Sequence, residues 1–283
     1  MTIRSDPWPL KSPRSGILAD GRWFWLRAVA WTTLLFVGAV GAFFATLQLT
    51  SWAPVLQGHG TLVALLVPAA TVVVYALLVR LIERRSAIEF QWSRAASELL
   101  VGALVGFVFI ASASLLLWLL GLNEVTRGTW HDAWHSFVFN AYISAVLEEL
   151  AFRAILLRLF ARMFGVWPGL ALSSLLFGLA HAGHASPVAV AELVVNGGGV
   201  LGLMYVVSGR LWLSIGAHVA YDFTEWSLMG VGNDDGLLLA RPVADYPDWL
   251  TGGSFGPDGS VLAVLVGAFI LWAILAVHRR LAA

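Results

Sequence analysis

The sequence predicts an all-α integral membrane protein, a polytopic bundle of about eight transmembrane helices. Hydrophobic residues make up 59% of the 283 residues and charged residues make up 12%, whereas soluble domains carry roughly 25% charged residues. The mean hydropathy of +0.81 agrees with this imbalance. The apolar residues also gather in separate segments, most of them close to the roughly 20 residues that a helix needs to cross a bilayer.

Eight apolar segments follow a polar start. Residues 1–21 contain Pro7, Pro9 and Pro13, and we expect them to form a flexible arm. The first apolar segment exceeds the roughly 7 to 15 residues of a signal-peptide core, so we expect it to remain as a span. The predicted spans cover about residues 28–49, 61–81, 99–120, 133–164, 168–181, 187–208, 212–226 and 260–277. No internal repeat is evident, so residues 22–283 are expected to form a single domain.

Basic residues at the ends of the spans predict the orientation of the bundle. They lie in segments 80–94 and 158–162, at Arg210, and in segment 279–280. If the amino terminus is cytoplasmic, eight crossings place all of these groups on the cytoplasmic side, as the positive-inside rule requires. The acidic loop 227–259 then lies on the opposite side. We therefore expect a plasma or inner membrane protein with both termini in the cytoplasm.

The composition restricts the chemistry that the protein can perform. The chain has no cysteine, which excludes disulfides, thiolate zinc sites and a cysteine nucleophile. Its 17 basic and 17 acidic residues give zero net charge, so nothing indicates nucleic acid as a partner, and no motif indicates a metal or another cofactor. Any catalysis is expected to use histidines, carboxylates or hydroxyls.

The fourth predicted span carries three charges within six residues, Glu148, Glu149 and Arg153. A charge at the centre of a membrane helix costs roughly 2.5 to 3.5 kcal/mol on insertion scales. Glu149 and Arg153 are four residues apart, so they share a helix face and are expected to pair. Glu148 lies about 100° around the helix and is left without a partner in its own segment. Its partner is expected on another helix, unless all three charges merely anchor the end of a shorter helix.

Two later spans carry histidines in an apolar setting. His181 follows Phe177 by four residues, and His218 precedes Asp222 by four. A water between Glu148 and His181 would be deprotonated by the buried carboxylate. A neutral His218 would donate an N–H to the oxyanion formed when that water attacks a carbonyl, and Asp222 would orient the ring or, when protonated, add a second donor.

Other polar residues compete for a place near this site. Glu192 and Asn196 lie four residues apart in the sixth span and, with Phe177, are candidates for lining a cavity. A purely structural hydrogen bond between Glu192 and Asn196 is the alternative. His184, one turn beyond His181, is expected at the membrane surface.

Taken together, EExxxR at residues 148–153, FxxxH at 177–181 and HxxxD at 218–222 resemble the motifs of the CAAX prenyl endopeptidase and Abi (CPBP) family of intramembrane glutamic proteases. The resemblance covers about residues 98–226. Each motif alone is common, but three in this order within hydrophobic segments are a fairly specific signal.

The resemblance implies an intramembrane endopeptidase that acts on a peptide or on a prenylated or lipidated protein at the membrane. On that basis Glu148 and His181 activate the water, His218 and residue 222 stabilise the oxyanion, and Glu149 with Arg153 holds the site together. One departure is evident. The prenyl endopeptidases have Asn at the last position, an obligate donor, whereas Asp222 donates only when protonated.

Two other functions remain open at the level of sequence. In a zinc-dependent protease, Glu148, His181 and His218 would bind the metal, although the HExxH motif is absent. In a non-catalytic membrane scaffold or transporter, the same polar residues would hold a partner's transmembrane segment or couple to protons. Inverted repeats and broken helices, which are typical of transporters, are not evident.

Overall fold

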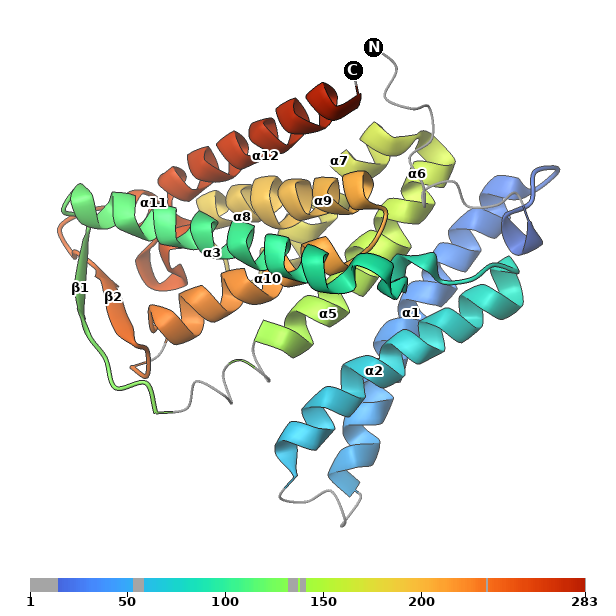
Figure 1. Cartoon of the computed structure of the whole chain (residues 1–283), viewed down its shortest axis with the longest axis horizontal. Helices are drawn as coiled ribbons and strands as arrows, with labels where there is room; N and C mark the ends of the chain where they lie inside the picture. Colours follow the sequence, from blue (N-terminus) through green and yellow to red (C-terminus); the bar gives the residue numbers. More distant parts are fainter. Residues whose placement is uncertain (1–14, 53–58, 132–136, 138–140, 233, 283) are drawn as a thin grey trace.

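The computed structural model describes residues 15–52, 59–131, 137, 141–232 and 234–282. It is a bundle of helices, and the described residues form one two-stranded sheet, which lies at the left edge of the bundle in Figure 1. The predicted all-α membrane fold is thereby confirmed. Among the described residues, five helical stretches are long and apolar enough to cross a membrane: Phe24–Leu49, Thr61–Glu83, Ile88–Leu119, Pro187–Ser208 and Val261–Arg280.

The elements follow one another along the chain with few long connections. The α-helices are α1 (Phe24–Trp52), α2 (Gly60–Leu78), α3 (Ala95–Leu119), α5 (Ile143–Glu149), α6 (Arg158–Phe164), α7 (Val166–Ala180), α8 (Pro187–Leu193), α9 (Leu201–Ser208), α10 (Trp212–Asp222), α11 (Asp248–Thr251) and α12 (Val261–Ala282). The strands are β1 (Asn123–Arg127) and β2 (Leu238–Pro242). The π-helical stretches among the described residues include η3 (Val79–Glu83), η7 (Leu150–Leu157), η8 (Val194–Val200) and η9 (Phe223–Leu228).

The remaining three predicted spans form helices that fall outside this set of five. Helices α5, η7 and α6 run without a break from Ile143 to Phe164, but five charged residues lie along them. Helix α7 has 15 residues, and α10 with η9 covers 212–228. The predicted start of the fourth span, 133–140, lies almost wholly outside the described residues. The count of eight crossings therefore stays a prediction.

Small residues bring α10 close against α3. A Cβ atom added to Gly102 or Gly106 of α3 would collide with the backbone of α10 at Leu213 or Ala217, and one added to Gly216 of α10 would collide with Leu99. Glycines that allow such close backbone approach are typical of packed membrane helices. The same holds for Gly198 of η8, where an added Cβ would meet Ser174 of α7. These contacts fix the helix that carries His218.

The acidic loop 227–259 is an ordered layer over one end of the bundle. Strand β2 within it pairs antiparallel with β1, with Val125 opposite Ala240. The short helix α11 and two 3₁₀ turns, η10 (Gly253–Phe255) and η11 (Pro257–Gly259), complete the layer. Asp258, a member of the acidic set that sequence places in this loop, is only 3% exposed. The loop is therefore part of the interior and not merely a solvated connection.

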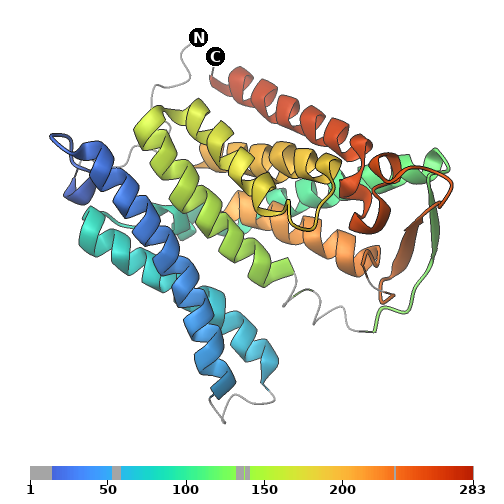
Figure 2. The ribbon, with the colours of Figure 1, turned by 180° about the vertical axis from the view of Figure 1, so that it is seen from behind.

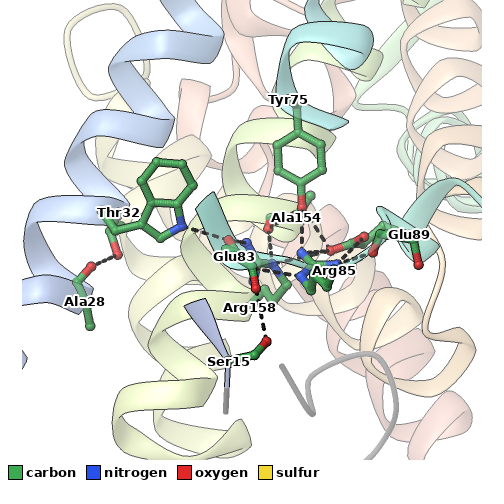
Figure 3. Close-up of polar contacts among 11 residues, drawn as sticks. Ser15, Ala28, Thr32, Tyr75, Glu83, Arg85, Glu89, Ala154 and Arg158 are labelled. Atoms are coloured by element: carbon green, nitrogen blue, oxygen red, sulfur yellow. Dashed lines mark hydrogen bonds and ion pairs between the residues drawn. The ribbon is translucent and has the colours of Figure 1, made fainter. Parts of the chain in front are cut away.

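A buried ionic network joins the first two helices to α6 (Figure 3). Arg158 donates to both oxygens of Glu83, at 2.7 and 2.9 Å. Arg85 donates to Glu83 at 2.7 Å and to Glu89 at 2.6 Å, and the Tyr75 hydroxyl donates to Glu89 at 2.9 Å. Buried carboxylates therefore neutralise both Arg85 and Arg158.

The end of the predicted flexible arm packs onto this network. Ser15 donates a hydrogen bond to the backbone oxygen of Glu83 at 3.0 Å, and Leu18 is 1% exposed. Arg27 of α1 donates to the backbone oxygens of Ile17 and Ala19. Residues 15–19 thus belong to the folded body, while residues 1–14 lie outside the described residues.

Candidate active site

The central helix places an ion pair at the base of the site. Arg153 Nη1 lies 3.2 Å from Glu149 Oε1, and both side chains are at most 1% exposed. The guanidinium of Arg153 also donates to the backbone oxygen of Gly197 and lies over the Phe177 ring, 4.7 Å from its centroid. Arg153 therefore fastens η8 and α7 to the helix that carries Glu148.

Glu148 is the more accessible of the two adjacent carboxylates, with its side chain 24% exposed. Ser144 Oγ, one turn earlier on the same helix, donates to Glu148 Oε1 at 2.9 Å. The expectation that Glu148 has no partner in its own segment is therefore wrong, because a serine hydroxyl reaches it from i−4. The other oxygen, Oε2, lies 3.9 Å from His218 Nε2 on α10.

His218 lies between three carboxyl groups. Its Nδ1 is 3.0 Å from Glu149 Oε1, and its Nε2 is 3.7 Å from Asp222 Oδ2 and 3.9 Å from Glu148 Oε2. An ionised carboxylate only accepts hydrogen bonds, so Nδ1 carries the proton in the contact with Glu149. In a neutral ring Nε2 would then be an acceptor. Only a ring with both nitrogens protonated donates from Nε2.

His181 lies directly after the last residue of α7. Its Nδ1 is 2.9 Å from the backbone oxygen of Phe177. Because a carbonyl oxygen only accepts, this contact places the proton on Nδ1 and leaves Nε2 as an acceptor. The ring packs at 5.1 Å from the Phe177 ring, which in turn lies edge-on to His218 at 6.1 Å. Phe177 therefore separates and orients the two imidazoles.

These side chains surround one cavity of about 300 Å³. Most of the residues predicted for the site line it: Glu148, Phe177, His181, Asn196, His218 and Asp222. Glu149 and Arg153 lie behind its wall as buried supports. Glu192, a candidate for the lining, is fully buried and does not line it. His184, expected at the membrane surface, does line it.

Sequence analysis missed a second group of cavity residues. Glu225 and Asp258 are 2% and 3% exposed, and the hydroxyl of Tyr221 donates to Asp258 Oδ2 at 2.7 Å. The Phe255 ring stacks on His184 at 6.2 Å. Glu225 follows Asp222 by three residues, a spacing that would have indicated the same helix face. Asp258 and Phe255 gave no signal, because the loop that carries them has no periodic pattern.

Comparison with known proteins gives a family match over part of the chain. Residues 130–224 match the family model described as type II CAAX prenyl endopeptidase, Rce1-like. The match contains all three motifs, and the resemblance inferred from them is confirmed over these residues. No curated protein matches the chain, and no solved structure matches it.

Proposed function

On the premise that residues 130–224 form an Rce1-like CAAX endopeptidase domain, we propose that the chain cleaves a peptide bond of a membrane-associated protein with a water molecule activated by Glu148 and His181. No covalent intermediate is formed. The observation that carries the proposal is the cavity in which Glu148 and His218 approach to 3.9 Å while His181 lines the same wall.

The contacts of the two water-activating residues suit this role. Ser144 occupies Glu148 Oε1, which leaves Oε2 to accept a proton from water. The backbone oxygen of Phe177 accepts a hydrogen bond from Nδ1 of His181. Nε2 of His181 is therefore left to accept the second hydrogen bond from the same water. Glu148 takes one proton as the water oxygen attacks the carbonyl carbon, and the proton then passes to the departing amine.

The oxyanion is stabilised by His218 in its doubly protonated form. Because Nδ1 donates to Glu149, the neutral ring assumed from sequence would present an acceptor to the oxyanion. An imidazolium presents an Nε2–H and a positive charge, and the three surrounding carboxyl groups favour that form. Asp222, at 3.7 Å from Nε2, orients the ring when ionised and adds a donor when protonated.

The test is cleavage of a membrane-anchored reporter by purified protein in lipid. Glu148→Gln and His181→Ala are expected to abolish cleavage, because each removes a group that handles the attacking water. Glu124→Gln, which alters an exposed carboxylate on β1, is the matched control and should cleave like the parent. Unchanged thermal unfolding would show that the fold is intact. Full activity of Glu148→Gln would overturn the proposal.

The same purified protein and its variants also test two alternative functions, a zinc-dependent protease and a non-catalytic scaffold. Among the described residues, no group of three or more His, Asp or Glu side chains is placed to hold a metal ion. Stoichiometric zinc that is lost together with activity would nevertheless favour a zinc-dependent protease. A Glu148→Gln variant that replaces the parent protein in cells would favour a scaffold.

A further inference from the structure

A short segment between α2 and α3 contacts both of the helices that carry Glu148 and His218. It consists of the 3₁₀ turn η4 (Ile88–Phe90) and Gln91, and we call it the connector. Glu148 lies on the continuous helix 143–164 and His218 on α10, and the helix 143–164 lies between α1 and α10 (Figures 1 and 2). The connector lies outside residues 130–224, which match the family model.

The side chain of Glu89 in the connector is joined to the helix 143–164. It is fully buried, and its Oε1 accepts from the Tyr75 hydroxyl at 2.9 Å and lies 3.3 Å from Arg158 Nε (Figure 3). The same two side chains converge on the backbone oxygen of Ala154, to which Arg158 Nε donates at 2.7 Å and from which the Tyr75 hydroxyl lies 3.3 Å. Ala154 belongs to η7, the π-helical stretch that begins directly after Glu149. Glu89 is therefore attached to the helix that carries Glu148.

The backbone of the connector is joined to the start of α10. The backbone oxygen of Glu89 accepts from the backbone N–H of Leu211, the residue directly before α10, at 3.0 Å. The backbone oxygen of Gln91 accepts from the indole of Trp212 at 2.9 Å. The Phe90 ring lies edge-on to the Trp212 ring at 6.0 Å. The connector therefore holds the first turn of the helix that carries His218.

The separation of Glu148 and His218 is not set by a bond between them. Glu148 Oε2 and His218 Nε2 are 3.9 Å apart, which is longer than a hydrogen bond. His218 is joined to the helix 143–164 by its bond to Glu149 at 3.0 Å, and a single bond lets the two helices tilt about it. The bond at Leu211 is a second attachment, about 10 Å along α10 from His218 at 1.5 Å per residue. Two attachments fix the angle between the helices, and a misplacement of about 1 Å costs up to about a hundredfold in rate.

We propose that Glu89 and Tyr75 are positioning residues of the active site, and that through them the connector sets the separation of Glu148 and His218. This inference rests on the proposed peptidase function. Glu89 acts on α10 through its backbone oxygen and on the helix 143–164 through its side chain, and Tyr75 acts through Glu89 and Ala154. Neither Glu89 nor Tyr75 lines the active-site cavity. Turnover is therefore expected to depend on them, and substrate binding is not.

The first experiment measures kcat and KM for the membrane-anchored reporter, at a temperature at which every variant is fully folded. Tyr75→Phe removes only a hydroxyl and is expected to lower kcat about tenfold with KM within about twofold of the parent. Trp31→Phe is the control, because it removes a donor to Glu83 in the same ionic network without altering a bond to the connector. It should lose at least as much stability, since a large buried ring is replaced by a smaller one, and keep the parent kcat. Parent-like kcat in Tyr75→Phe, or equal losses in the two variants, would overturn the proposal.

The second experiment observes the position of His218 without using activity. In protein with 15N-labelled histidine, the ring signals of His218 are assigned by their loss in His218→Gln. Tyr75→Phe is expected to shift these signals, because the surroundings of both ring nitrogens depend on the separation of the helices, and Trp31→Phe should leave them in place. Unmoved His218 signals in Tyr75→Phe would refute the positioning role and leave the peptidase intact. Cleavage that does not depend on Glu148 would refute the peptidase mechanism, while the His218 signals would still decide the positioning role.

Discussion

At the scale of single residues, two adjacent glutamates with the same chemistry have different surroundings. Glu149 is fully buried and contacts both Arg153 and His218. Glu148 is partly exposed in the cavity and contacts Ser144. One carboxylate therefore neutralises buried charge and fixes an imidazole, and the other is available to water. The difference arises from the 100° rotation between neighbours on a helix.

This difference predicts that substitution by glutamine affects stability strongly at Glu149 and weakly at Glu148. Glu149→Gln leaves the Arg153 guanidinium buried without its counter-charge, so we expect it to lower the free energy of unfolding by about 3–5 kcal/mol and to reduce cleavage as well. Glu148→Gln is expected to change the free energy of unfolding by less than about 1 kcal/mol, since a partly exposed polar group is replaced by its isostere. Thermal unfolding in detergent measures both, and equal stability of the two variants would contradict this assignment.

Residue 222 provides a test of the oxyanion donor. Asp222 donates a hydrogen bond only when protonated, whereas an asparagine in its place donates at every pH. We expect Asp222→Asn to keep cleavage activity and to flatten its dependence on pH above neutrality. Loss of activity with unchanged folding would show instead that the negative charge of Asp222 sustains the His218 imidazolium.

Asp258 in the loop layer predicts a pH-dependent stability. Burial raises the pKa of its carboxyl above the ordinary value of 3.8. The folded protein then holds this proton to higher pH than the unfolded chain, so its contribution is most favourable at low pH and declines as pH rises from about 4 through the folded-state pKa. Asp258→Asn should remove that decline. Melting temperatures of both proteins at a series of pH values test this, and parallel curves would refute it.

At the scale of elements, glycines set the distance between α3 and the helix that carries His218. Gly106 faces the backbone of α10 at Ala217, one residue before the histidine. Helices α5 and α6 are joined by the π-helical stretch η7, and π-helical turns occur frequently at functional sites because they locally redirect side chains. The position of each site residue therefore depends on the fit between helices as well as on its own helix.

Gly106→Ala is expected to reduce cleavage at least about tenfold and to lower stability by about 1–3 kcal/mol, since the added methyl group overpacks the interface with α10. Gly41→Ala in α1 is the matched control, because an added Cβ there meets nothing within 4 Å. Measuring cleavage activity and melting temperature of the two variants tests whether the close packing of α3 against α10 is required. A Gly106→Ala protein with full activity would show that α10 can move away without disturbing His218.

At the scale of the whole molecule, the α1–α2 hairpin is fastened to α6 by buried charges and not by apolar contact alone. Glu83 is the last residue of η3, which continues α2, and it accepts from Arg158, which is fully buried. The indole of Trp31 on α1 donates to the same carboxylate at 2.7 Å. A segment outside the Rce1-like match is therefore tied to the helix that carries Glu148.

Removing one partner of the Glu83–Arg158 ion pair is expected to lower the free energy of unfolding more than replacing both partners. Glu83→Ala leaves Arg158 and Arg85 short of a counter-charge and should destabilise the protein by about 3–5 kcal/mol. The double variant Glu83→Leu with Arg158→Met removes both partners and should lose less, because apolar side chains of similar size replace a pair that was costly to desolvate. A double-mutant cycle on thermal unfolding measures the coupling, and additive losses would contradict it.

Much of the fold and part of the site could be predicted from local patterns. Hydropathy identified the apolar segments, and i, i+4 spacing predicted the Glu149–Arg153 pair, which lies at 3.2 Å. Hydropathy alone did not fix the number of crossings, because five charges lie along 143–164 and because α7, although apolar, has only 15 residues.

The sequence by itself determined that this is a helical membrane protein with Glu148, His181 and His218 set in apolar segments, since those facts depend only on residue type and on distance along the chain. Only the tertiary structure decided that His218 binds Glu149 and that the loop with Asp258 covers the cavity. Such contacts join residues that are distant in the sequence, 69 positions apart for His218 and Glu149. They depend on how helices pack, which no local pattern encodes.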